Sequence, residues 1–148
     1  MMKLNTASEL ISFTKKLEED SAKFYEELSQ RYVKDKDVFL SFAKENKKNI
    51  IQIERAYYGV ISDALEGCFA FTIDPVEYSL KTEFGEKASY SETLGKAINI
   101  EKIIIKFYSD AAEQSKSYMA DVPRAFKMIA KKRGNRQLTL KSLIGKED

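Results

Sequence analysis

The sequence predicts an all-α protein, a four-helix bundle made of two repeated helix pairs that are joined by a long crossover. Three observations lead to this prediction. Apolar residues recur at spacings of three and four in four long stretches, which is the period of an amphipathic helix. Only two prolines and six glycines interrupt the 148 residues. The second half of the chain also repeats the pattern of the first. With 43% hydrophobic and 32% charged residues, the chain fits one globular domain over residues 1–148.

The first helix pair is expected over about residues 7–65. Its first helix should start after a polar cap at Asn5 or Thr6 and end around residues 29–32. A short polar connection at residues 33–37 precedes the second helix. The inner face of this second helix carries Phe39, Phe42, Ala43, Asn46, Asn49, Ile50 and Ile53. Two amides therefore interrupt an otherwise apolar stripe.

A crossover is expected over about residues 66–90, where the helical period is lost. This segment is too long for a tight hairpin, and it suits a connection that returns the chain to the far end of a bundle. The second helix pair should then span residues 91–143. Pro123 is well placed in the first turn of the fourth helix, where a missing N–H costs nothing.

Each helix pair places one acid on the apolar face of its first helix. Glu18 stands seven residues before Tyr25, and Glu101 stands seven residues before Tyr108. Each tyrosine belongs to a Phe-Tyr pair. A carboxylate on a buried face is costly unless another group pairs with it. Both acids are therefore expected to face polar partners inside the bundle, although they could instead be ordinary acids on a helix surface.

The second and fourth helices align when the chain is shifted by 87 residues. In this alignment Asn46 matches Arg133, and Asn49 matches Arg136. Residues three apart on a helix project from the same face, so each of these helices should direct two polar side chains inward. Alternatively, the two arginines belong to a solvated basic face, because the last 25 residues are rich in Lys and Arg. The two asparagines could equally be ordinary polar residues near a helix edge.

The two halves resemble the rubrerythrin-type branch of the ferritin-like four-helix bundles, over residues 7–60 and 91–143. That family carries an acid shortly before a Phe-Tyr pair and, on the partner helix, a Glu-x-x-His motif, and these motifs together hold two iron ions. The resemblance implies a ferritin-like fold, a di-iron site and a homodimer. This chain keeps both acids but departs from the family at all four positions of the Glu-x-x-His motifs.

The departure predicts a bundle that has lost its metal. The six former metal-site positions are Glu18, Asn46, Asn49, Glu101, Arg133 and Arg136. A guanidinium cannot ligate a cation, and a neutral amide is a weak ligand. We therefore expect Arg133 and Arg136 to fill the metal space and to pair with the two glutamates one for one. We assign no metal, no cofactor and no catalytic residue, and we interpret Tyr25 and Tyr108 as core or interface aromatics.

Three functions compete. The first is a non-catalytic bundle with a structural or binding role. The second is a di-iron oxidoreductase, a peroxidase or ferroxidase, whose atypical site is completed by Glu45 or Glu54. Glu45 directly precedes Asn46 and should point about 100° away from it, which counts against this interpretation. The third is a protein that binds an acidic partner through the basic fourth helix. No motif that interleaves aromatic and basic residues accompanies this helix, so the sequence does not favour nucleic acid.

Composition narrows the remaining possibilities. The chain has no histidine, so it lacks the commonest general base and the commonest transition-metal ligand. Cys68 is the single cysteine, and with no internal disulfide possible we expect a reducing, cytoplasmic location. No apolar run of 18 residues is present, so no membrane partner is expected. Aromatics that could support a homodimer are Tyr57, Tyr58, Phe69 and Phe71.

Overall fold

The computed structural model describes residues 4, 6–60, 72–115 and 122–147. These ranges form four long helices, α1 (Ala7–Arg31), α2 (Lys36–Val60), α4 (Tyr90–Ser115) and α5 (Val122–Glu147), and two short 3₁₀ turns, η1 (Val33–Asp35) and η2 (Pro75–Tyr78). No strand occurs in the described part of the chain, where the only β-type pairing is an isolated bridge between Leu4 and Ile73. The predicted all-α architecture with four helices is confirmed.

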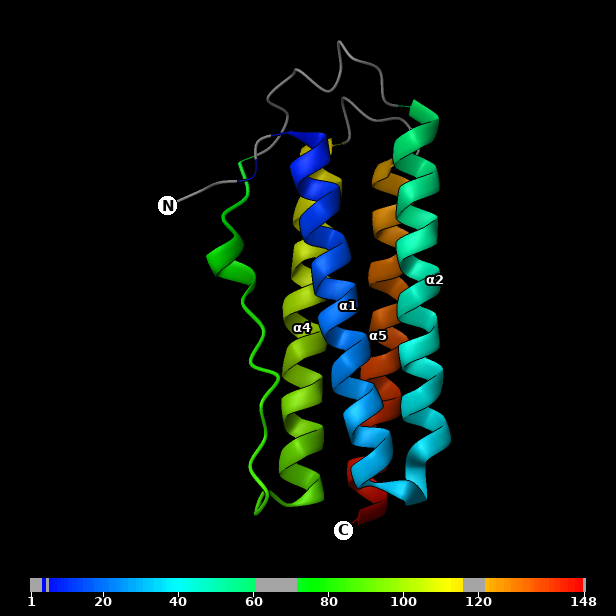
Figure 1. Ribbon diagram of the computed structural model, residues 1–148, viewed down its shortest axis with the longest axis vertical. Coiled ribbons are helices and arrows are strands. Elements are labelled where there is room, and N and C mark those ends of the chain that lie inside the picture. The colour runs from blue at the N-terminus through cyan, green and yellow to red at the C-terminus, as the bar shows by residue number, and fades with distance from the viewer. Residues whose placement is uncertain (1–3, 5, 61–71, 116–121, 148) are drawn as a thin grey trace.

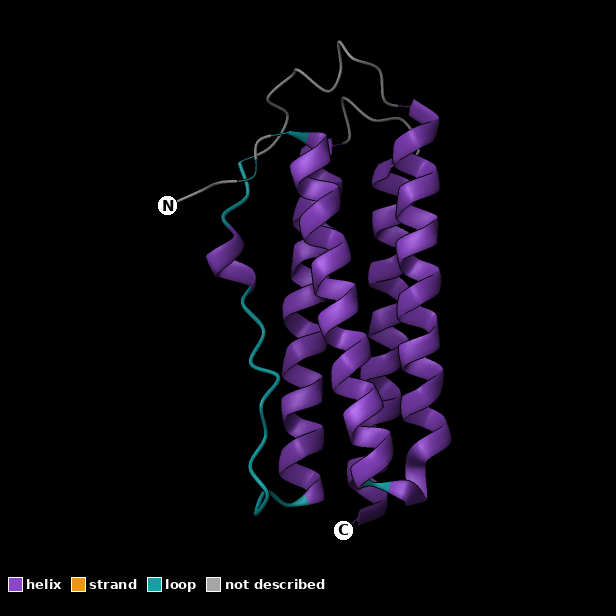
Figure 2. Ribbon diagram, in the orientation of Figure 1, coloured by secondary structure: helices purple, strands orange, loops and turns teal. Residues whose placement is uncertain are grey.

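The four helices lie side by side as two antiparallel pairs (Figure 1). α1 packs mainly on α2, α4 packs mainly on α5, and α2 also contacts α5. The chain leaves α2 at one end of the bundle and enters α4 at the other. The described part of the connection, residues 72–89, runs along the α1–α4 side, where Figure 2 shows it as an extended loop interrupted by η2. Consequently α2 and α4 point in the same direction.

Local sequence explains where α1 begins and ends. Thr6 caps the helix, because its side chain accepts a hydrogen bond from the Glu9 amide while the Glu9 carboxylate accepts one from the Thr6 amide. The helix ends at Arg31, within the range expected from the sequence. The expected end of the second helix near residue 65 and the start of the crossover lie outside the described residues, and so does the alternative cap Asn5.

The crossover is fastened to the bundle by both apolar and polar contacts. The Tyr78 ring packs edge-on against Phe107 with centroids 5.3 Å apart, and its hydroxyl donates to Asp110. Further along, the Arg31 guanidinium donates to the backbone oxygen of Glu86 at 2.6 Å. Because these anchors lie on α1 and α4, residues 72–89 cover that side of the bundle, and no described segment covers the α2–α5 side (Figure 1).

The core is apolar at both ends of the bundle and polar between them. Its largest fully buried side chains include four phenylalanines and two tyrosines, but Arg133 and Arg136 belong to the same set. A buried guanidinium is expensive unless carboxylates and hydrogen-bond acceptors surround it. The middle of this bundle must therefore supply such partners.

Candidate functional site

All six positions singled out from the sequence face the interior and come together at the centre of the bundle. Glu18, Asn46, Asn49, Glu101 and Arg133 are 0% exposed, and Arg136 is 2% exposed. We call these six residues the ion-pair cluster. Each of the four long helices contributes at least one member. Because both arginines are buried, the alternative that they belong to the solvated basic face is wrong.

Arg133 lies between the two glutamates and bonds to both. Its Nη1 donates to Glu101 Oε1 at 2.6 Å, and its Nη2 donates to Glu18 Oε2 at 2.7 Å. The Nε also donates to Glu18 Oε2, at 3.2 Å. Arg133 Nη2 is further shared with Asn46 Oδ1 at 3.3 Å. One guanidinium thus bridges carboxylates from α1 and α4, an arrangement for which the planar fork of arginine is well suited.

Arg136 does not complete the one-for-one pairing expected from the sequence. Its Nη1 is 3.5 Å from Glu101 Oε2, a long contact, and 2.8 Å from Asn46 Oδ1. Its shortest ion pair is instead with Glu45, where Nη2 donates to Oε1 at 2.7 Å. The expected pairing is therefore wrong in this detail. The reason is reach, because the long arginine side chain extends from the cluster to the flank of α2.

Sequence reasoning considered Glu45 only as a metal ligand and missed it as an ion-pair partner. Its direction, about one-third of a turn from Asn46, places it at the edge of the bundle, where its side chain remains 36% exposed. Aromatic faces also support Arg136, whose guanidinium carbon lies 4.7 Å from the ring centre of Phe42 and 5.3 Å from that of Tyr25. The position of Glu45 beside the inward Asn46 was the signal that could have revealed the pair.

The two tyrosines have a role that the sequence interpretation missed. Tyr25 on α1 donates its hydroxyl to Glu101 on α4, and Tyr108 on α4 donates to Glu18 on α1, both at 2.6 Å. Because α1 and α4 run antiparallel, a tyrosine two turns beyond the glutamate of one helix lies level with the glutamate of the other. The repeated seven-residue spacing was the signal for this exchange.

The protonation states follow from these contacts. Burial favours the neutral acid at Glu101, but Arg133 and Arg136 outweigh it and hold the pKa of this carboxyl below its ordinary value. Burial alone would lower the pKa of Arg133, yet Glu101 and Glu18 raise it well above the usual value. Burial and the neighbouring carboxylate raise the pKa of both Tyr25 and Tyr108. The phenols therefore stay protonated and act as hydrogen-bond donors to carboxylates.

The two asparagines supply the smaller contacts of the cluster. Asn49 Nδ2 donates to Glu18 Oε1 at 3.1 Å, and Asn46 Nδ2 donates to Ser21 Oγ at 2.9 Å. Two buried atoms in this region, Asn49 Oδ1 and Arg136 Nε, have no hydrogen-bond partner among the described residues. Almost every other polar atom is satisfied, which is what a buried network needs to avoid a large desolvation cost.

These side chains do not fit the di-iron centre that the resemblance implies. Such a centre needs anionic oxygen donors and neutral imidazoles. Here a fixed positive charge, the Arg133 guanidinium, stands between the two carboxylates and uses their lone pairs. Within the described residues, no three His, Cys, Asp or Glu side chains are grouped so that they could hold a metal ion.

The other predicted residues fall outside this cluster. Glu54 lies 3.8 Å from Lys15 in a partly exposed ion pair. Tyr57 is buried, whereas Tyr58 is 69% exposed. Cys68, Phe69 and Phe71 lie outside the described residues, so their expected roles have no structural counterpart here.

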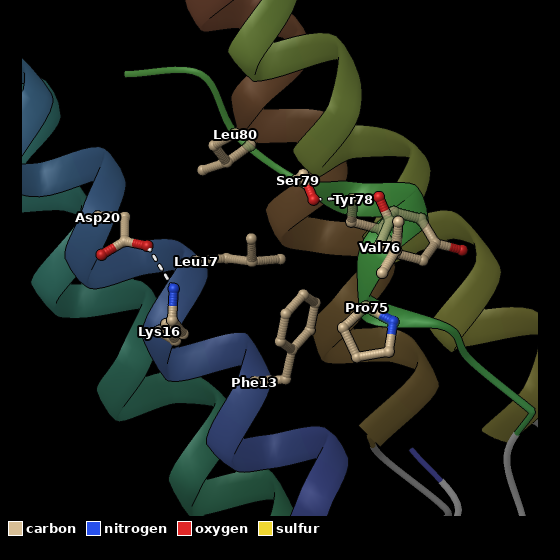
Figure 3. A pocket seen from close by; sticks show the side chains of 9 residues that line it. All are labelled: Phe13, Lys16, Leu17, Asp20, Pro75, Val76, Tyr78, Ser79 and Leu80. Atoms are coloured by element: carbon tan, nitrogen blue, oxygen red, sulfur yellow. Dashed lines mark hydrogen bonds and ion pairs between the residues drawn. The ribbon is translucent and has the colours of Figure 1, made fainter. Parts of the chain in front are cut away.

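A separate groove lies between α1 and the crossover (Figure 3). Its volume is about 450 Å³, and its lining is Phe13, Lys16, Leu17, Asp20, Pro75, Val76, Tyr78, Ser79 and Leu80. The aliphatic and aromatic side chains face one another across the groove, while Lys16 and Asp20 pair at its rim, with Nζ and Oδ2 3.0 Å apart. This groove shares no residue with the ion-pair cluster.

Comparisons with known proteins add no family. No family model matches the chain, and neither a curated protein nor a solved structure is significantly similar to it. Among the helices that the structure describes, none combines the length and the apolar character that a membrane crossing requires.

Proposed function

We propose that this chain is a ferritin-like bundle of the rubrerythrin type that has exchanged its di-iron site for ion pairs and has a non-catalytic, structural or binding role. The observation that carries the proposal is the Arg133 guanidinium, which is fully buried and bonded to both Glu18 and Glu101. The course of the chain also supports it, because two antiparallel helix pairs joined by one long crossover is the connectivity of ferritin-like bundles.

Charge balance explains why the exchange would be tolerated. The six cluster residues carry two negative and two positive charges, as the two carboxylates face two guanidiniums. Removing the iron from a di-iron site without replacing it would leave uncompensated buried carboxylates, which is strongly unfavourable. Arginine at positions 133 and 136 supplies the missing positive charge permanently, with no dependence on metal supply.

The competing oxidoreductase reading has little support from these contacts. It requires Glu45 or Glu54 to complete a metal site, but Glu45 pairs with Arg136 and Glu54 lies beside Lys15. Both acids also stand at the rim of the bundle. We therefore assign no catalytic role to either residue.

Metal content and a restored ligand set test the proposal together. Purified wild-type protein, incubated anaerobically with ferrous iron and desalted, should contain no stoichiometric iron by mass spectrometry. A quadruple variant, Asn46→Glu, Asn49→His, Arg133→Glu and Arg136→His, rebuilds both Glu-x-x-His motifs. This variant should gain about two irons per chain, the number that the complete motif set holds.

A matched control shows whether any gained iron sits at the rebuilt site. Adding Glu18→Gln and Glu101→Gln to the quadruple variant should abolish the gain, whereas Glu19→Gln, an exposed change on α1, should leave it intact. Stoichiometric iron in the wild-type protein would overturn the proposal. A folded quadruple variant that binds no iron would also count against it, because the cluster would then not occupy a former metal site.

The resemblance further suggests a homodimer, and the single cysteine suggests a reducing, cytoplasmic compartment. Light scattering of the purified chain tests the first part directly. A monomer at all concentrations would remove the homodimer from the proposal without affecting the loss of metal.

A further inference from the structure

Charge is distributed unevenly over the bundle. The residues of α2 and α5 carry 13 cations and four acids, a net charge of +9. The residues of α1, α4 and the crossover segment 72–89 carry nine cations and 14 acids, a net charge of −5. The chain as a whole is only +2. Leaving out the buried pairs of the ion-pair cluster gives 11 cations and four acids on α2 and α5, a net charge of +7, and nine cations and 12 acids on the other side, a net charge of −3. The small net charge therefore conceals a basic layer beside a weakly acidic one.

The basic layer, α2 and α5, also forms the side of the bundle that no described segment of the crossover covers. The crossover packs against α1 and α4 (Figure 1), and no described segment covers the line along which α2 meets α5. We call this line the α2–α5 seam and define it by Lys48, Ile51, Gln52, Arg55, Met128 and Lys132. Gln52 ties the two helices together, because its Nε2 lies 3.8 Å from Met128 Sδ and its Oε1 accepts from Lys132 at 3.4 Å.

The centre of the seam is apolar and its margin is positive. Ile51 is 50% exposed and Met128 is 47% exposed, so two large apolar side chains face outward. A hollow of about 450 Å³ is lined by Lys48, Ile51, Gln52 and Arg55. Within the described ranges, no acidic side chain forms an ion pair with Lys48, Arg55 or Lys132. The nearest α2 acids in sequence, Glu45 and Glu54, are directed to Arg136 and Lys15 instead.

We propose that the α2–α5 seam is a docking surface for an acidic amphipathic helix of another protein. An amphipathic helix commonly binds by laying its apolar face into a hydrophobic groove. Here the hollow lies on the outward face of α2, and Met128 and Lys132 of α5 border it through Gln52. Ile51 and Met128 would contact its apolar face, and Lys48, Arg55 and Lys132 would contact carboxylates on either side. An apolar centre with a charged rim is the anatomy of a protein interface.

Two other occupants fit the seam less well. Nucleic acid is bound mainly through its phosphates, which would leave Ile51 and Met128 facing a highly charged backbone. A symmetric contact between two copies of the seam would set its cations against each other, and like charges at an interface are costly. An acidic protein helix satisfies both the charge and the apolar centre.

This inference supplies a partner class for the binding role, but it does not rest on the loss of the metal site. The seam lies outside the bundle, and none of its residues belongs to the ion-pair cluster. The iron titration, which tests the lost metal site, and the binding experiment, which tests the docking surface, can therefore give a negative result independently of each other.

The experiment uses the full chain and a synthetic probe. The probe is a fluorescent peptide of about five helical turns, with leucines on one face and glutamates on the others. A scrambled peptide of the same composition serves as its control. We expect saturable binding of the patterned peptide by fluorescence anisotropy, and binding weaker by about tenfold or more for the scrambled one.

Paired variants locate the binding surface. Ile51→Ser with Met128→Ser should weaken binding of the patterned peptide by about tenfold, as expected for two contacts at an interface centre. Lys48→Ser with Lys132→Ser should weaken it and reduce its salt dependence. The matched control is Lys23→Ser with Lys102→Ser, two exposed lysines on α1 and α4, which should leave binding unchanged. All substituted side chains are at least partly exposed, so thermal melting should show folded proteins.

Several results would overturn the proposal. Equal binding of both peptides would reveal unspecific charge attraction, and no saturable binding at low salt would remove the docking surface. Tighter binding of single-stranded DNA or of phosphatidylserine vesicles than of the peptide, unaffected by the serine pair at positions 51 and 128, would assign the surface to another partner. A wild-type dimer that this serine pair dissociates would assign it to a second copy of the chain.

Discussion

The two helix pairs use the same interior positions for different chemistry. In the α1–α2 pair, the inward residues are one carboxylate, Glu18, and two neutral amides. In the α4–α5 pair, the carboxylate Glu101 is accompanied by two guanidiniums. The first set is therefore negative and the second positive, and neither would be neutral alone. The centre of the bundle becomes neutral only when the two helix pairs, which carry opposite net charges, pack together.

The tyrosine exchange reinforces this dependence. Each phenol donates to the glutamate of the other pair, and Arg133 reaches across to Glu18. Buried charges left without partners cost several kcal/mol each, so neither pair should be stable in isolation. The comparison teaches that similar helix pairs can be made interdependent by placing opposite charges at matched positions.

Removing the bridging cation, Arg133, is the most severe test of whether the two helix pairs depend on each other. Arg133→Met should lower the free energy of unfolding by about 5 kcal/mol or more, because two buried carboxylates lose their shared partner. Chemical denaturation measures the loss. Lys131→Met, an exposed change on the same helix, should cost little. A variant at position 133 that is as stable as the position 131 control would show that Arg133 does not hold the two halves together.

The two glutamates should not be equivalent. Glu101→Ala should cost about 3–5 kcal/mol because Arg133 and Arg136 both lose a carboxylate. Glu18→Ala should cost less, because Arg133 keeps its short ion pair with Glu101. Denaturation of the two variants side by side measures the difference. Equal losses would mean that Arg136 gains nothing from its long contact with Glu101.

Protonating Glu101 is a milder change than deleting it. Although burial favours the neutral acid, the two arginines keep the pKa of Glu101 below the ordinary 4.5. As the pH falls below 4.5, the unfolded chain binds a proton at Glu101 that the folded protein does not, so stability decreases. This contribution is lost completely once the pH passes below the folded pKa. Denaturation curves between pH 6 and about 3 should show the decrease, and a folded Glu101→Gln variant should show a shallower one.

Removing a single phenol should have a smaller effect. Tyr25→Phe and Tyr108→Phe should each cost about 1.5–3 kcal/mol, because each removes one hydrogen bond to a charged group. Thermal melting of both variants provides the measurement. Because the two contacts are reciprocal, both variants should lose similar stability. A loss confined to one variant would show that the two tyrosine–glutamate contacts are not equivalent. Tyr58→Phe, at an exposed position, is the neutral control.

The smallest expected change is a gain in stability at a position where the halves differ. Gly134 lies within α5, and its counterpart 87 residues earlier in α2 is Lys47. A Cβ added at Gly134 would meet no atom within 4 Å. Gly134→Ala should therefore stabilise the protein by about 0.5–1 kcal/mol through helix propensity and reduced freedom of the unfolded chain. A loss of stability in urea titration would reveal a functional or packing need for glycine there.

Much of the architecture could be predicted because helix formation is governed by local pattern. The three- and four-residue apolar period located all four helices, and the Thr6 cap was among the two expected starting points for α1. The same period placed Asn46, Asn49 and Glu101 on inner faces, where the structure has them. The expected partners of Arg136 were only partly right, because helical period says which way a side chain points and not how far it reaches.

The sequence by itself determined which residues face inward and that their charges could balance. Only the tertiary structure decided which charge meets which. Arg133 bridges two acids, Arg136 turns to Glu45, and the tyrosines bond across the bundle. These partners depend on the axial register of each helix relative to its neighbours. That register is set by packing between segments far apart in the chain. A residue pattern within one helix contains no information about the axial register between helices.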